Sequence, residues 1–182
     1  MNKIKDTLLE LIETFVVSFV VIFLIYKFVA SMEVVSGSSM EPSFETGERI
    51  LVDKVSPFFK PFKRGEVVVL IPPNESSKHY IKRIVAVPGD IIKIFECKVL
   101  VSNDIGQFVL QESYLAPDTC TLGGTLLRDG RSVRLGFQEY AVLGDNRSYS
   151  VDSRFFGIIA RKNLLGRVVF RFWPPAKAGF LR

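Results

Sequence analysis

The sequence predicts a mainly β protein that carries one transmembrane helix at its amino terminus. Past Met32, short runs of β-branched residues are separated by Gly, Pro and Asn, and helical periodicity is scarce. Before Met32, the chain is apolar over a length that suits a lipid bilayer. The 182 residues, 48% of them hydrophobic, are enough to bury a core. We expect a short tail and anchor at 1–32, a β core at 33–92 and 138–182, and a β-rich inserted subdomain at 93–137.

The expected membrane anchor covers residues 11–32. Residues 14–26 include only two polar side chains. At about 1.5 Å per residue, the stretch can cross a hydrocarbon core of about 30 Å if Glu13 and Lys27 extend to the two membrane surfaces. The sequence therefore predicts a single-pass protein.

The charges near the amino terminus indicate an orientation. Lys3 and Lys5 precede the apolar stretch, which favours a cytoplasmic amino terminus and a β domain on the outer face of the plasma (inner) membrane. The alternative is a cleavable signal peptide, because Lys3 and Lys5 also form a basic segment before an apolar one, and small residues follow at 29–31.

Six strands are expected in the core and at the start of the insertion. The run at 67–71 is apolar on both faces, as in a central buried strand. The predicted strands are 49–55, 66–71, 79–87, 91–95, 139–143 and 166–172.

The insertion at 93–137 is less regular and contains both cysteines of the chain, Cys97 and Cys120. Their separation matches no metal-ligand spacing. They form either one disulfide that staples the insertion or two free buried thiols.

The basic residues point to lipid rather than nucleic acid as a partner. The net charge of +5 is spread along the chain and mixed with acids, whereas a nucleic-acid-binding protein gathers its charge on one face. Aromatic residues lie beside cations at 57–64 and 170–175, which suits contact with membrane lipid headgroups. Closing the ends of a β core is the other interpretation of these aromatics.

The stretch SGSSMEP at 36–42 is the first with catalytic potential. Glycine and three serines follow an apolar run, so a tight turn can expose the hydroxyl of Ser39. Ser, Gly and Pro are also common in turns without a catalytic role.

The second stretch is YIKRIVAVPGD at 80–90. On a strand, Lys82 shares a face with Tyr80 and Ile84, so its amino group is expected among apolar neighbours. Burial lowers a lysine pKa, and about 4 kcal/mol of desolvation would bring it near 7, where the neutral amine can act as a base. The alternative is a lysine whose head extends into water.

The third stretch is the polar loop GDNRSYSVDSR at 144–154, which by itself is typical of a surface turn. His79 is the only histidine and is expected at the surface, so a histidine-rich metal site is not supported. A single histidine would be enough for a Ser-His-Asp triad, but nothing around His79 favours one.

Together and in this order, these stretches resemble the bacterial type I signal peptidases. The resemblance spans nearly the whole chain apart from the insertion. It is carried by the anchor, 37–43, 64–68, 80–83 with 88–90, and 144–154.

The resemblance implies a β catalytic domain that removes signal peptides from exported preproteins with a Ser/Lys dyad and without a metal or cofactor. Ser39 falls on the nucleophile position and Lys82 on the general-base position. The positions around the dyad are Ser150, which orients the lysine, Asp145, Asp152 and Arg154, which brace the site by ion pairs, and Arg83 as the partner of Asp145.

The resemblance also implies shallow apolar pockets for small substrate residues. Our candidates for their lining are Met40, Val35, Tyr80 and Ile81. Gly37 stands where many family members have a serine that assists the oxyanion hole, so Ser36 or Ser38 is left as a possible second donor beside the N–H of Ser39.

Two other classes of protein remain open. A Ser/Lys self-cleaving repressor-type protease shares a similar β core, but the anchor and the absence of a helix-turn-helix pattern argue against it. A membrane-anchored binding module or inactive relative would keep the fold without catalysis, and the presence of Ser39, Lys82 and Ser150 argues against that.

Overall fold

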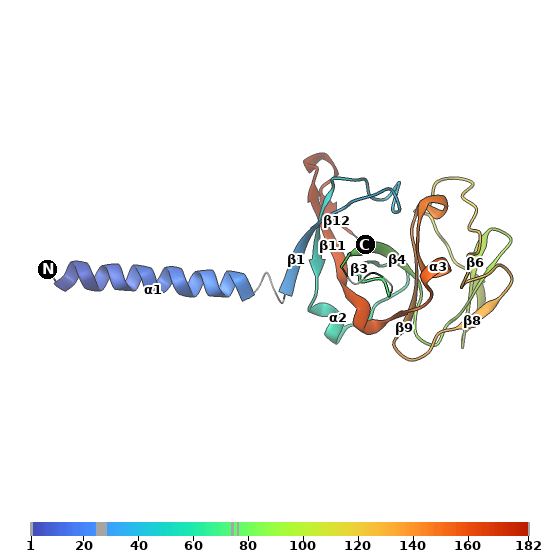
Figure 1. Ribbon diagram of the computed structural model, residues 1–182, viewed down its shortest axis with the longest axis horizontal. Coiled ribbons are helices and arrows are strands. Elements are labelled where there is room, and N and C mark those ends of the chain that lie inside the picture. The colour runs from blue at the N-terminus through green and yellow to red at the C-terminus, as the bar shows by residue number, and fades with distance from the viewer. Residues whose placement is uncertain (1, 25–28, 74, 76, 182) are drawn as a thin grey trace.

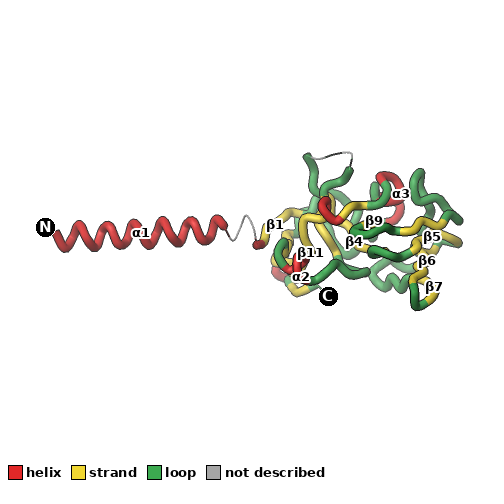
Figure 2. Tube along the Cα trace, turned by 90° about the horizontal axis from the view of Figure 1, so that it is seen from below, coloured by secondary structure: helices red, strands yellow, loops and turns green. Residues whose placement is uncertain are grey.

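The computed structural model describes residues 2–24, 29–73, 75 and 77–181. It is mainly β, as expected, with one long helix at the amino terminus (Figures 1 and 2). Helix α1 (Asn2–Leu24) includes a 20-residue segment, Lys5–Leu24, with a mean hydropathy of 2.2 and none of its apolar surface buried. In the described part of the chain it is the one helix long and apolar enough to cross a membrane.

The expected anchor at 11–32 is wrong at its carboxyl end. Ala30–Val34 forms strand β1, in which Met32 pairs with Leu51. Hydropathy does not distinguish a lipid-facing helix from an apolar strand, because the partner that makes this segment a strand lies some twenty residues further along the chain. Lys27, whose side chain was expected to extend to the membrane surface, lies outside the described residues.

The larger sheet has eight strands and is antiparallel throughout. Seven of them lie in the order β1-β2-β11-β3-β4-β9-β10. Strand β12 pairs with β11 outside this path. After β1, the strands are β2 (Arg49–Asp53), β3 (Val67–Leu70), β4 (Tyr80–Ala86), β9 (Glu139–Leu143), β10 (Ile159–Ala160), β11 (Leu164–Trp173) and β12 (Gly179–Phe180).

Strand β3 buries both of its faces, as its apolar run predicted. Val67 and Val69 belong to one core cluster with Phe44 and Ile50. Val68 and Leu70 belong to another on the opposite face. The sheet is therefore covered on both sides at its centre, next to β4.

A second, four-stranded sheet has the order β7-β6-β5-β8. Its strands are β5 (Ile91–Phe95), β6 (Lys98–Asn103), β7 (Gly106–Val109) and β8 (Ser132–Arg134). It lies at the end of the β domain opposite to β1 (Figures 1 and 2). Val99 and Val101 of this sheet share a core cluster with Val85 and Leu143 of the larger one, so the two sheets pack together. The domain division at 93–137 stays a prediction.

Cys97 and Cys120 form a disulfide, with their Cα atoms 4.4 Å apart. Of the two alternatives left open by the sequence, the staple is the one observed. Cys97 precedes β6, and Cys120 lies in the long connection between β7 and β8, so the bond ties that connection to the sheet.

Short helical turns complete the fold and leave several aromatics exposed. They are α2 (Ser56–Phe59), η2 (Arg147–Tyr149), α3 (Ser153–Phe156), η3 (Arg161–Asn163) and η4 (Pro175–Lys177). Phe62, in the aromatic stretch at 57–64, is buried in the core. It therefore follows the interpretation in which these aromatics close the end of the β core. Phe58, Phe59 and Trp173 are exposed at 79%, 81% and 50%, so both aromatic stretches also place rings at the surface.

All six predicted strands are present. Strands β5 and β9 have the expected bounds, and the other four differ by one or two residues at one or both ends. Strands β1, β6, β7, β8, β10 and β12 were not predicted.

Candidate active site

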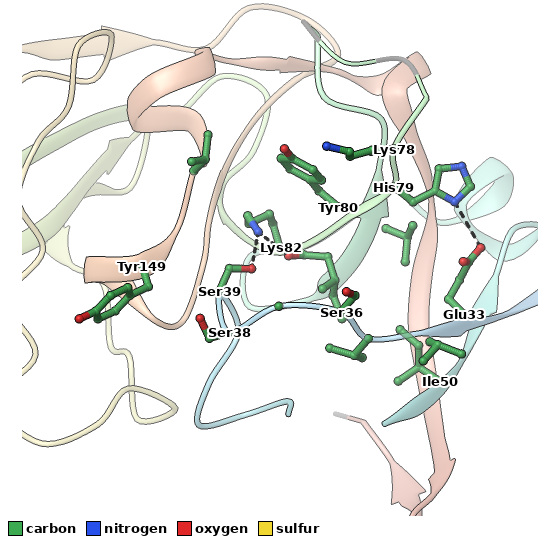
Figure 3. Close-up of a pocket in the computed structure, with 16 residues that line it drawn as sticks. Glu33, Ser36, Ser38, Ser39, Ile50, Lys78, His79, Tyr80, Lys82 and Tyr149 are labelled. Carbon is green, nitrogen blue, oxygen red and sulfur yellow. Dashed lines mark hydrogen bonds and ion pairs between the residues drawn. The ribbon is translucent and has the colours of Figure 1, made fainter. Parts of the chain in front are cut away.

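Ser39 lies on a turn that follows β1. Gly37 has a φ of 89°, a conformation that glycine adopts without strain, and its N–H donates to Thr46 Oγ1 at 3.1 Å. Met40 and Phe44 are fully buried, and the Phe44 N–H donates to the Met40 carbonyl at 2.9 Å. These apolar anchors fix the turn and leave the half-buried Ser39 side chain at the edge of a cleft (Figure 3).

Lys82 reaches Ser39 from β4. Its Nζ donates to Ser39 Oγ at 2.7 Å and to the Ile81 carbonyl at 2.9 Å (Figure 3). Lys82 is only 3% exposed, and its Nζ lies 5.2 Å from the centre of the Tyr80 ring. The lysine therefore does not extend into water, and the alternative of a solvated head is wrong.

Burial lowers the pKa of Lys82 from 10.5 to about 8, because the ammonium loses its hydration. The carboxylates of Asp152 and Asp145 oppose this change, and the positive charge of Arg154 adds to it. The neutral amine is therefore accessible near pH 8. A neutral Lys82 can accept the hydroxyl proton of Ser39 across the same 2.7 Å contact.

The loop after β9 closes against Ser39. The Asn146 N–H donates to the Ser39 carbonyl at 3.1 Å. Gly144 packs against the same carbonyl, and a Cβ at this position would collide with both Ser39 O and Ser150 Oγ. Ser150 is buried, and its Oγ has no hydrogen-bond partner among the described residues. Its hydroxyl therefore remains available at the site.

Two buried ion pairs surround the dyad. Arg83 Nε and Nη2 donate to the two carboxylate oxygens of Asp145 at 2.9 and 2.6 Å, which is the pair expected from the sequence. Arg154 binds Asp152 through Nε and Nη2, both at 2.8 Å. Asp152 Oδ2 also accepts from the Gly144 N–H at 3.0 Å. The loop is thus held by charge-assisted hydrogen bonds that are shielded from solvent.

A cleft of about 570 Å³ opens beside the two side chains (Figure 3). Ser36 and Ser38 both line it. The structure places Met40 elsewhere, because its side chain is fully buried in the core. Three of the four candidate pocket residues line the cleft: Val35, Tyr80 and Ile81.

His79 lies at the rim of this cleft and not at the dyad. Its Nδ1 is 3.4 Å from Glu33 Oε1, and its side chain is 48% exposed (Figure 3). The described hydrogen bonds of Ser39 include Lys82 and none with His79, so a Ser-His-Asp triad has no geometric support. Among the described residues, no group of three or more His, Cys, Asp or Glu could hold a metal ion.

Comparison with known proteins shows the family of the chain. The family described as signal peptidase, peptidase S26, matches residues 8–173. The chain belongs to this signal peptidase family. It is 34% identical to a probable signal peptidase I-2 of Synechocystis sp., over 97% of this chain and 78% of that relative. It is 33% identical to signal peptidase I of Bacillus amyloliquefaciens, over 93% of this chain and 90% of the relative.

The chain is also similar to one further curated protein and to one solved structure. Signal peptidase IB of Staphylococcus aureus is 33% identical, over 93% of this chain and 92% of the relative. A crystal structure of a signal peptidase I from Enterococcus faecalis aligns with a TM-score of 0.48 and 20% identity, over 59% of this chain and 97% of that one. The family prediction is confirmed, and the chain is a serine peptidase of the signal peptidase I type. Helix α1 fits a membrane-anchored member of the family.

Sequence reasoning about the signal peptidase site missed four residues that the structure brings to it. Arg147 and Gly144 stand inside the motif at 144–154, and that position was the only signal for them. Glu112 and Tyr114 lie in the irregular insertion, and their contacts with Arg147 and Arg83 become visible only in the folded chain.

Proposed function

We propose that this peptidase removes amino-terminal signal peptides from exported preproteins, with Ser39 as the nucleophile and Lys82 as the general base. The observation that carries the proposal is the 2.7 Å contact between Lys82 Nζ and Ser39 Oγ in a buried setting. Ser39 opens onto a cleft, so a peptide carbonyl can reach its hydroxyl. The relatives named signal peptidase supply the reaction type.

The reaction consists of two acyl transfers. Neutral Lys82 takes the proton of the Ser39 hydroxyl as the oxygen bonds to the scissile carbonyl carbon. The tetrahedral intermediate then collapses, the C–N bond breaks, and Lys82 returns the proton to the leaving amine. Lys82 next takes a proton from the water that attacks the ester carbonyl carbon. As the C–O bond to Ser39 breaks, Lys82 gives that proton to Ser39 Oγ, which releases the signal peptide and restores the hydroxyl and the neutral amine.

We assign positioning roles to the residues around the dyad. Arg83 and Asp145 fix β4 to the loop after β9, and Arg154 and Asp152 fix the loop itself. The unpartnered hydroxyl of Ser150 is available to orient the Lys82 amine. In this proposal the two buried ion pairs keep the loop in place beside Ser39 and Lys82.

The oxyanion hole is proposed to use the Ser39 N–H, which donates no described hydrogen bond. The Gly37 N–H is already bound to Thr46. Ser36 and Ser38 line the cleft, and either hydroxyl can supply the second donor.

The substrate pockets are proposed to include Val35, Tyr80 and Ile81 beside Ser39. Shallow apolar walls suit small side chains at the first and third positions before the cleaved bond. The site also lies close to the anchor in sequence, since β1 begins at Ala30 and α1 extends to Leu24. A signal peptide that spans the bilayer has its cleavage point just outside the membrane, close to where this site is proposed to lie.

The enzyme is proposed to be a single-pass protein of the plasma (inner) membrane with its β domain on the outer face. Lys3 and Lys5 favour a cytoplasmic amino terminus. The disulfide suits an oxidising compartment. Exposed Phe58, Phe59 and Trp173 are proposed to contact membrane lipid.

We expect Ser39→Ala and Lys82→Ala each to lower cleavage of a purified preprotein by at least about a thousandfold, because each removes one partner of the dyad. Exposed Ser132→Ala and Lys98→Ala are matched controls and retain wild-type rates. His79→Ala retains cleavage within severalfold, which separates the dyad from a triad. Wild-type rates in Lys82→Ala would contradict the dyad, and a wild-type chain without activity would favour the inactive-relative alternative.

A further inference from the structure

The insertion contributes side chains to the active-site loop. Arg147, on η2 in that loop, is buried, with its side chain only 1% exposed. Its two terminal nitrogens form an ion pair with Glu112, with Nη1 at 3.2 Å from Oε2 and Nη2 in closer contact with Oε1. Nη1 also donates to Thr121 Oγ1. Both described side-chain partners of the two terminal nitrogens therefore come from the connection between β7 and β8.

Glu112 is the counter-charge of this guanidinium. Its own side chain is 9% exposed, so water does not compensate either charge. A buried charge whose partner is removed is strongly unfavourable, and the loop would have to move to solvate Arg147. Glu112 therefore determines where Arg147 can lie.

Tyr114 connects the same carboxylate to Arg83. The Tyr114 hydroxyl donates to Glu112 Oε1 at 2.6 Å. Its ring lies 3.9 Å from the guanidinium carbon of Arg83. Arg83 follows Lys82 on β4 and binds Asp145, so this second path ends beside the dyad lysine.

Arg147 transmits its position to Ser39 over a short distance. Its Nε donates to the Gly144 carbonyl at 3.0 Å. The preceding residue, Asn146, donates its N–H to the Ser39 carbonyl at 3.1 Å. Gly144 packs against that carbonyl and against Ser150 Oγ. A shift of Arg147 therefore moves the backbone that holds the nucleophile.

We propose that Glu112 and Tyr114 are positioning residues of the peptidase, which act through Arg147 and Arg83 to hold the 144–150 loop against Ser39 and Lys82. The inference rests on the proposed function of that dyad. It assigns the insertion a role in catalysis, although neither residue touches the reacting atoms.

The disulfide between Cys97 and Cys120 supports the contact of Thr121 with Arg147. Thr121 follows Cys120, and its N–H donates to the Cys97 carbonyl at 3.0 Å. The bond thus fixes the residue that accepts from Arg147. Glu112 and Thr121 thus reach the guanidinium from one connection, and the disulfide anchors that connection at Cys120.

The test compares Glu112→Gln, Tyr114→Phe and Tyr114→Leu in the full-length chain with a peptide substrate. Glu112→Gln keeps the side-chain shape, Tyr114→Phe removes only the hydroxyl, and Tyr114→Leu also removes the ring. We expect kcat to fall at least tenfold in Glu112→Gln and Tyr114→Leu and at least threefold in Tyr114→Phe, with KM within threefold of wild type. Asp104→Asn, an equal loss of charge at an exposed site of the insertion, is the matched control and retains wild-type kcat.

Each variant is assayed at least 20 °C below its own Tm, so that a loss of folded enzyme does not lower kcat. Values of kcat within twofold of wild type in Glu112→Gln and Tyr114→Phe would overturn the inference. If Glu112→Gln does not fold, Tyr114→Phe alone decides by the same limits. Ser39→Ala separates the two proposals: an active wild type with an inactive Ser39→Ala and unaffected insertion variants overturns only this inference.

Discussion

Lys82 carries its amino group into the protein, and burial determines the acid–base behaviour of the site. Its side chain is buried, and the loss of hydration lowers its pKa from the ordinary 10.5 to about 8. The two carboxylates nearby limit the fall, since Asp145 and Asp152 favour the ammonium. A lysine in this setting is a base at mildly alkaline pH, whereas an exposed lysine would stay protonated.

The pH dependence of cleavage follows from that pKa. Below about 8, Lys82 is protonated and cannot accept the Ser39 proton, so kcat/KM is expected to rise about tenfold per pH unit up to about pH 8 and then level off. Initial rates on a peptide substrate from pH 6 to pH 10 measure this, with circular dichroism at each pH as the control for folding. A profile that is flat across this range would point to another base.

At the residue level, sequence reasoning identified Ser39, Lys82 and the two ion pairs because they stand in compact motifs. It placed Met40 in a substrate pocket, whereas the Met40 side chain is buried in the core and anchors the turn there. A motif specifies residue types and spacing, but it does not indicate which side of a turn faces the solvent. Glu112 was missed because it lies in the irregular insertion, outside these motifs, so nothing in the sequence links it to Arg147.

The loop at 144–154 is the element that brings the site together, and glycine is required at its first position. Gly144→Ala is expected to cost about 1–3 kcal/mol of stability and to lower kcat at least tenfold, because the new Cβ would displace Ser39 and Ser150. Thermal unfolding and peptide cleavage measure the two effects. Gly179→Ala, where an added Cβ meets no atom within 4 Å, is the matched control. Equal behaviour of the two variants would contradict the close packing at Gly144.

Among the elements, two of the predicted strands have a clear burial pattern. Strand β3 is buried on both faces, and β9 is buried along four of its five residues. Strand β7 has four exposed residues and therefore no pattern to detect. The first three residues of β1 were assigned to the anchor because they continue the apolar run, and only the pairing with β2 reveals the strand.

The whole molecule couples two sheets through one shared core and through the ion pair of Arg147 with Glu112. Sequence patterns predicted the mainly β class, and the motifs resembled those of the signal peptidases over most of the chain. They left the insertion without a function, because its contribution depends on long-range contacts and on the disulfide. The insertion is thus joined to the active site in space, although it interrupts the core in sequence.

Orientation in the membrane is the prediction at this scale. The two native cysteines are paired, so an Ile105→Cys variant carries the only free thiol, at a hairpin tip that is 95% exposed. If the β domain lies outside, a membrane-impermeant maleimide labels this variant in intact spheroplasts. Asn2→Cys, at the amino-terminal end of α1, is the matched control and is labelled only after lysis. Labelling of Ile105→Cys only after lysis would contradict the orientation, and it would leave the disulfide in a compartment where such bonds are rare.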